Sequence, residues 1–228
     1  MRAVLASTWG PTHKKYLGAF LDTAKRNGLD PQNFDATDWE GGGDWTKIPW
    51  YRKSEGQARF VRDTRGQYDV YLFTDSMDVV FAAGWEEILR KFSALDSPIV
   101  CAAESYPWPD INQAGLYPAT HHRCRYLNAG MWIAVAEAAE MFANDLSGIA
   151  ARREKCDQQI SVDLFLGKKH PIKLDTACSL MFCLNLDSPS YLDMSGARPR
   201  TTDTGEEPVM FHANGNSNLI PICQKIAP

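Results

Sequence analysis

The chain carries its strongest structural signal in the run Tyr68-Asp-Val-Tyr-Leu-Phe-Thr-Asp-Ser-Met-Asp78. The first part of this run is an almost continuous series of apolar residues that favour β-structure, as expected of a central parallel strand covered on both faces. Two acidic residues, Asp75 and Asp78, follow at its carboxyl end. Because ligands of open α/β sheets bind outside the carboxyl ends of the strands, the run predicts a buried strand with a ligand site at its end.

Further strands and helices alternate on both sides of this run. Strand patterns cover 2–8, 99–103, 172–175 and 179–184, helix patterns cover 16–27, 54–64, 85–92, 136–146 and 157–166, and buried and small residues alternate over 126–135. Ser54 and Asp157 are expected to cap their helices, and the Ser-, Pro- and Gly-rich segment 185–207 to form a loop. The alternation predicts one α/β domain, 1–228, with a mostly parallel sheet flanked by helices.

Composition narrows the class of protein. The 228 residues are enough to bury a core without disulfides, and the six cysteines include no C-x-x-C pair, so reduced, mostly buried thiols are expected rather than a zinc site. The net charge of −4 gives no overall basic field that would attract nucleic acid. No apolar run reaches the ~18 residues of a membrane span, and the apolar start is too short for a signal peptide. The sequence therefore predicts a cytoplasmic protein without a membrane partner.

Asp75 and Asp78 form a candidate metal site. Two carboxylates at one strand end repel each other unless a cation lies between them. Mg²⁺ and Mn²⁺ favour carboxylate oxygens and keep positions open for phosphate oxygens, as a nucleoside diphosphate requires. Helix caps and solvated turns also produce a D-x-x-D pattern, so the position after a buried strand is what favours the metal. His212 ends the short apolar run Pro208-Val-Met-Phe-His212, where a histidine is more often structural than a ligand.

Six short blocks carry a resemblance to a known family. They are Leu72-Phe-Thr-Asp-Ser-Met-Asp-Val-Val-Phe81, Ala102-Ala-Glu-Ser-Tyr-Pro-Trp-Pro109, Tyr126-Leu-Asn-Ala-Gly130, Asp157-Gln158, Leu174-Asp175 and Phe211-His-Ala-Asn-Gly215. In this order they resemble the glycosyltransferase domain of procollagen lysyl hydroxylases and related procollagen galactosyltransferases, over residues 37 to 216. Six ordered blocks are far more specific than any one of them.

The resemblance implies a GT-A type, Rossmann-like fold and the transfer of a hexose, glucose or galactose, from a UDP-sugar to a hydroxyl of a macromolecule. It implies Mn²⁺, or Mg²⁺, held by Asp75, Asp78 and His212. It also divides the domain into a nucleotide-sugar half, 1–103, and a half that binds the acceptor and completes the metal site, 104–228. The implied acceptor is a hydroxylated protein or peptide of the hydroxylysine type.

The same resemblance assigns the pocket residues. Glu104 and Asp157 are the expected catalytic carboxylates, with Asp157 as the base if transfer inverts the anomeric carbon. The glycine-rich loop at 41–43 and Lys47 are expected near the donor phosphates, with Lys53 as the alternative lysine. The other expected donor or acceptor contacts are Thr8, Ser76, Met77, Trp108, Asn128, Gln158, Asp175, Asn214 and Gly215.

Several of these residues also have a purely structural interpretation. Asp157 can cap a helix, Trp108 can pack, and Asn128 can stabilise a turn. The chain also departs from the family's pattern. Met77 stands where the family commonly has a tyrosine that holds the nucleotide, and Cys156 stands where it often has aspartate.

Two alternatives stay open at this point. A flipped hydroxymethylated pyrimidine in viral DNA is a second possible acceptor. The basic stretch Arg52–Arg65 would then form one wall of a groove, although a solvated helix face explains such a run more often. A catalytically silent nucleotide-sugar-binding domain is the alternative from another class.

Overall fold

The computed structural model describes residues 1–9, 17–34, 50–152, 155–185, 188–215 and 217–227. Its central feature is a six-stranded sheet in the order β2-β1-β3-β6-β5-β7. The strands are β1 (Ala3–Ser7), β2 (Gln32–Asn33), β3 (Val70–Thr74), β5 (Ile99–Glu104), β6 (Tyr126–Val135) and β7 (Ile172–Asp175). All neighbours pair in parallel except β6, which runs antiparallel to both β3 and β5. The mostly parallel sheet that the sequence predicts is confirmed.

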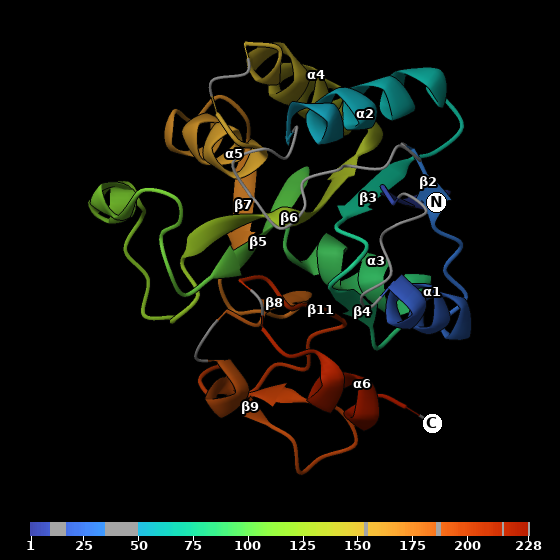
Figure 1. Ribbon diagram of the computed structural model, residues 1–228, viewed down its shortest axis with the longest axis vertical. Helices are drawn as coiled ribbons and strands as arrows, with labels where there is room; N and C mark the ends of the chain where they lie inside the picture. The colour runs from blue at the N-terminus through green and yellow to red at the C-terminus, as the bar shows by residue number, and fades with distance from the viewer. Residues whose placement is uncertain (10–16, 35–49, 153–154, 186–187, 216, 228) are drawn as a thin grey trace.

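Helices cover both faces of this sheet (Figure 1). On one face lie α2 (Trp50–Asp63), α4 (Ala136–Ala150) and α5 (Asp157–Leu166), and on the other lie α1 (Leu17–Arg26) and α3 (Trp85–Ala94). Each layer has its own buried cluster, since side chains of successive strand residues point to opposite faces. The α/β architecture, with helices on both faces of a central sheet, is thus confirmed.

A smaller three-stranded sheet stands beside the carboxyl ends of the large one. It has the order β4-β11-β8, where β4 is Val79–Phe81, β8 is Met181–Cys183 and β11 is Met210–His212. β11 pairs antiparallel with β4 and parallel with β8. The turn at 75–78 connects β3 of the large sheet directly to β4 of the small one. The two sheets therefore meet at Asp75 and Asp78.

The remaining elements lie toward the lower and left edges of Figure 1. They are η1 (Ile111–Leu116), η2 (Ser188–Tyr191), β9 (Leu192–Asp193), β10 (Arg200–Thr201) and α6 (Ile220–Lys225). Among the described residues of 185–207, where a loop was expected, β9 and β10 form an antiparallel pair. Arg198 fastens this pair to α3 through two hydrogen bonds to Glu87, of 2.8 and 3.1 Å.

Two helix starts differ from the prediction. α2 begins at Trp50, so Ser54 is a buried residue inside the helix rather than its cap. Asp157 is the first residue of α5, and Cys156 occupies the cap position. A carboxylate in the first turn still interacts favourably with the helix dipole. Among the described residues, no helix is long and apolar enough to cross a membrane.

Candidate active site and metal centre

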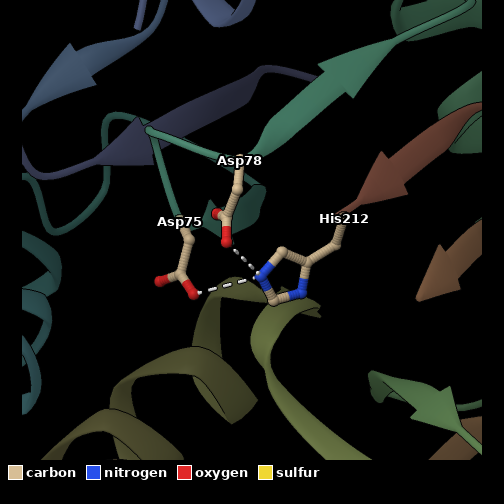
Figure 2. Close-up of side chains that lie close together, drawn as sticks. All are labelled: Asp75, Asp78 and His212. Carbon is tan, nitrogen blue, oxygen red and sulfur yellow. Dashed lines mark ion pairs between the residues drawn. The ribbon is translucent and has the colours of Figure 1, made fainter. Parts of the chain in front are cut away.

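Asp75, Asp78 and His212 converge where the two sheets meet (Figure 2). One ligand atom from each lies within 4.8 Å of the other two. His212 Nε2 is 3.5 Å from Asp75 Oδ2 and 3.3 Å from Asp78 Oδ2. His212 is buried, whereas both aspartates are partly open to solvent. Two carboxylate oxygens and one imidazole nitrogen, with one side accessible, form a donor set suited to a divalent cation that also binds a ligand.

Backbone pairing in the small sheet explains why His212 reaches the aspartates. His212 of β11 lies opposite Val79 of β4. The next residue, Ala213, donates its N–H to the carbonyl of Asp78 at 2.7 Å. The antiparallel register thus fixes the histidine beside the residue that precedes β4. A strand from the end of the chain completes a site that begins at residue 75.

An irregularity in β6 makes room for this cluster. The register of β6 on β5 shifts between Cys101, which faces Trp132, and Ala102, which faces Asn128. Residues 129–131 of β6, between these two pairings, form the shifted segment. Gly130 lies in this segment, and its carbonyl accepts the N–H of Asp75 at 2.8 Å. A Cβ at Gly130 would lie 2.2 Å from His212 Cε1 and 2.8 Å from Asp75 Oδ2. Only glycine fits here, so the backbone is shaped around the ligand-forming side chains.

Asn128 fixes the proton on His212. Its Oδ1 accepts the N–H of Gly130 at 2.9 Å and lies 3.1 Å from His212 Nδ1. Because an amide oxygen only accepts, Nδ1 must carry the proton in this contact. When the ring is neutral, its lone pair is therefore on Nε2, the nitrogen that would bind a cation placed between His212 and the two aspartates. This tautomer is the one that binds a metal, so the residues fit the cation that the sequence predicts.

Glu104 is buried in a cage of three amides. Its carboxylate accepts hydrogen bonds from Asn128 at 3.2 Å, Asn185 at 3.3 Å and Asn214 at 2.8 Å. Burial raises its pKa to about 7, against the partial opposition of the Asn128 and Asn214 hydrogen bonds and the charge of His212. Glu104 also anchors the amide that sets the tautomer of His212. The carboxyl is therefore coupled to the metal centre through one intervening side chain.

Lys53 lies between two of the site's carboxylates. Its Nζ is 2.6 Å from Asp75 Oδ1 and 2.8 Å from Asp157 Oδ2. Burial alone would lower the pKa of Lys53, but the charges of Asp157 and Asp75 outweigh it and raise the pKa. Partial burial raises the pKa of Asp75, whereas the charge of His212 overcomes burial and lowers that of Asp78. Burial alone would lower the pKa of His212, but the charges of Asp78 and Asp75 outweigh burial and raise it.

The other expected contact residues divide into three groups. Ser76 and Met77 lie between Asp75 and Asp78 in the chain, and Asn214 and Gly215 follow His212. Ser76 Oγ donates to the carbonyl of Thr8 at 2.6 Å, and the amide of Asn214 donates to Glu104 at 2.8 Å. Gln158 braces the shifted segment, since its Oε1 accepts the N–H of Ala129 at 2.7 Å. Its Nε2 donates to the carbonyls of Leu127 and Trp108, so its amide is directed to backbone rather than to a ligand. Lys47 and the 41–43 loop lie outside the described residues.

Asp175, one of the expected donor or acceptor contacts, directs its carboxylate to the backbone. Its carboxylate accepts the backbone N–H groups of Ser179, Leu180 and Met181 at 2.7–3.0 Å, and the side chain is fully buried. These bonds hold the turn between β7 and β8. A polar residue at a strand end often contacts a ligand. At the end of β7, however, the carboxylate of Asp175 accepts hydrogen bonds from the backbone.

Sequence reasoning missed Asn185 and Gly130. Asn185 follows Leu184 just beyond β8, so the strand-end rule that found Asp75 also applies to it. Gly130 was visible only as one letter of a resembling block. Its need for a bare Cα becomes clear when the shifted register places it against His212.

The fold resembles that of a known glycosyltransferase. A solved structure described as "a glycosyltransferase involved in the glycosylation of the major capsid of PBCV-1" covers 98% of this chain and 98% of its own, with a TM-score of 0.55. Its sequence is 9% identical, so this likeness concerns the fold alone.

The family is shown by sequence. The family model described as the PLOD GT domain matches residues 16–220, and the chain belongs to this family. Procollagen-lysine,2-oxoglutarate 5-dioxygenase 2 of Mus musculus is 30% identical over 192 residues, 80% of this chain. The corresponding dioxygenase 1 of Bos taurus is 32% identical over 163 residues, 66% of this chain. Multifunctional procollagen lysine hydroxylase and glycosyltransferase LH3 of Rattus norvegicus is 28% identical over 195 residues, 80% of this chain. The chain spans only 26%, 21% and 25% of these relatives' lengths.

Proposed function

We propose that this glycosyltransferase moves glucose or galactose from a UDP-sugar to a hydroxylysine-type hydroxyl of a polypeptide, with a divalent cation, Mn²⁺ or Mg²⁺, held by Asp75, Asp78 and His212. The observation that carries the proposal is the convergence of these three ligand atoms within 4.8 Å in a PLOD GT domain. His212 Nε2 is held ready by the Asn128 contact, and Gly130 leaves the space that the ligands need.

Each half of the domain has its own task in this proposal. Residues 1–103 bind the nucleotide-sugar through Thr8, Ser76 and Met77, and residues 104–228 bind the acceptor and complete the metal site. When bound, the cation supplies positive charge to the diphosphate leaving group. Asn214 and Gly215 belong to the second half, but they follow the metal ligand His212, and we assign them to the donor held by the metal. Trp108, which is half exposed, is assigned to the acceptor.

Glu104 and Asp157 are the proposed catalytic carboxylates. Asp157 lies at the start of α5, tied through Lys53 to the metal ligand Asp75, so it is close to the reacting centre. In an inverting transfer it accepts the proton of the acceptor hydroxyl. Glu104 supports positive charge at the anomeric carbon and holds Asn128 in place.

The contacts made by the basic stretch Arg52–Arg65, most of which lies in helix α2, favour a peptide acceptor over DNA. Lys53 is turned inward into the site, so it is not part of a basic wall. Arg65 is paired with Glu140, and Arg62 with Asp63. Three of the five basic residues of this stretch are thus paired with carboxylates of the protein. The relatives named for procollagen lysine support the peptide independently.

The test measures UDP release by the purified chain with UDP-glucose or UDP-galactose, with Mn²⁺ or with EDTA. Asp75→Ala and Asp78→Ala are expected to lose at least about a hundred-fold of the metal-dependent rate, since each removes a charged ligand. Asp69→Ala is a matched control, because this exposed carboxylate lies just before β3 and pairs with Arg2. Full activity in either ligand variant would refute the metal assignment.

Acceptors are then compared with the UDP-sugar from which UDP is released. Transfer to a hydroxylysine peptide is the expected result, and transfer to hydroxymethylated DNA alone would replace the proposed acceptor. Binding of the nucleotide-sugar by calorimetry, without release or transfer with any acceptor, would identify a silent binding domain instead.

A further inference from the structure

Lys53 is a cation built into the protein at the edge of the metal site. It belongs to the first turn of α2, and its side chain is 6% exposed. Its Nζ contacts Asp75 at the end of β3 and Asp157 at the start of α5. The ammonium therefore links three elements that are separate in the sequence.

The contacts of Lys53 use the whole ammonium group. Besides the two carboxylates, Nζ lies 3.5 Å from the carbonyl of Ala129, in the shifted segment of β6. Three acceptors correspond to the three N–H bonds of a lysine. A lysine bound in this way is directed at protein groups rather than at the phosphates of a donor.

The contact with Lys53 gives the two oxygens of Asp75 different partners. Oδ1 receives Lys53 at 2.6 Å, whereas Oδ2 faces His212 Nε2 at 3.5 Å. With one oxygen fixed by the ammonium, the carboxylate has one rotamer that presents the other oxygen to the cluster. Lys53 also screens Asp75 from Asp157, two carboxylates that would otherwise repel each other.

We propose that Lys53 is a positioning residue that acts as the site's permanent second cation: it fixes Asp75 as a one-oxygen metal ligand and holds Asp157 beside the metal centre. This inference rests on the proposed glycosyltransferase function. It assigns donor-phosphate binding to groups other than Lys53. In this role the lysine joins the metal site to the acceptor site, and both depend on its charge and its length.

The first experiment measures Mn²⁺ binding to the EDTA-treated protein by isothermal titration calorimetry. Lys53→Met is expected to bind Mn²⁺ about ten-fold more weakly, as for other residues that orient a metal ligand. Lys53→Arg, which keeps the charge, is expected to recover most of the affinity. Lys91→Met is the matched control, because Lys91 is also buried but donates to the carbonyls of Ser179 and Glu207. It is expected to leave Mn²⁺ affinity unchanged.

The sign of the effect is decisive. If Lys53 only repelled the metal, its removal would tighten Mn²⁺ binding. Tighter or unchanged binding in a Lys53→Met protein with native circular dichroism would overturn the proposal. If Lys53→Met does not fold, Lys53→Met/Asp157→Asn removes one of the two unpaired carboxylates. This double variant is then compared with Asp157→Asn, and the same ten-fold difference is expected.

Transfer rates test the link to Asp157. The loss caused by Lys53→Met should be much smaller in an Asp157→Asn background than in the wild type, because the lysine acts partly through that carboxylate. Fully additive losses would contradict the link. Absence of UDP release by the wild type would sink the proposed function, whereas the Mn²⁺ titrations would still decide the role of Lys53.

Discussion

Two carboxyls, Glu104 and Asp175, end the neighbouring parallel strands β5 and β7, and their exposed fractions are 2% and 0%. Their partners are of opposite kinds. Asp175 accepts backbone N–H groups four to six residues ahead of it, whereas Glu104 accepts side-chain amides from Asn128, Asn185 and Asn214. The first set of bonds closes a turn, and the second set reaches from distant elements into the site. Position at a strand end therefore does not decide a role; the partners do.

The strongest test of this comparison removes Asp175. Asp175→Ala leaves three N–H groups, two of them buried, without their acceptor, and it is expected to lower the free energy of unfolding by about 4 kcal/mol. The Mn²⁺ affinity of the folded fraction should not change. Urea unfolding followed by circular dichroism gives the stability, with Asp193→Ala as a control at an exposed carboxylate. A stable Asp175→Ala protein with lost metal binding would reverse the roles assigned to the two carboxyls.

A second test uses pH to distinguish the carboxyl of Glu104 from that of Asp175. With a pKa of about 7 in the fold, Glu104 binds a proton more tightly there than in the unfolded chain, so stability from this group falls as pH rises from 4.5 to 7. At 1.36 kcal/mol per pH unit the difference reaches about 3 kcal/mol. Glu104→Gln should remove this slope, so its free energy of unfolding relative to the wild type rises between pH 4.5 and pH 8.

The measurement is urea unfolding at several pH values with EDTA present. Parallel pH profiles for wild type and Glu104→Gln would show that Glu104 does not titrate in this range. The same variant is expected to lose transfer activity, which Asp175 variants that fold should retain per folded molecule.

The smallest expected effect belongs to the amide between Glu104 and the metal centre. Asn128→Ala removes the acceptor that keeps the proton on His212 Nδ1. We expect Mn²⁺ affinity to fall by about 10- to 100-fold, or about 1.4 to 2.8 kcal/mol. Asn112→Ala is a control, because this exposed amide donates to Asp110 within η1's own cap. Unchanged affinity in Asn128→Ala would mean that His212 keeps its tautomer without help.

Much of the fold was accessible from the sequence, because apolar runs and helical periodicity report burial directly. The run before Asp75 and Glu104, the polar residue that ends β5, located the ligand edge of the sheet. Alternation over 126–135, however, carries no information on strand direction. The antiparallel β6 and its shifted register, which place Asn128 and Gly130 at the site, could not be predicted from it.

The burial of Lys53 could have been predicted from its helical spacing, but its charge placed it among the basic residues of an exposed helix face. Counted with Arg59 and Arg62, it belonged to a basic stretch. At helical spacing it instead shares a stripe with Gln57 and Val61, and all three are buried. Glu104 and Asp175 could not be told apart in this way, since both are single acidic residues at the ends of apolar strands.

The small sheet also sets the order in which the site can be built. β11 lies between β4 and β8, and neither outer strand has the other as a neighbour. During synthesis the two aspartates leave the ribosome early, but the strand that unites the sheet emerges only with residues 210–212. Pairing Phe81 with Met210 requires closure of a long loop, which is slow. A nascent chain that stops short of β11 thus carries both carboxylates without His212, so the proposed cation site is completed only late in folding.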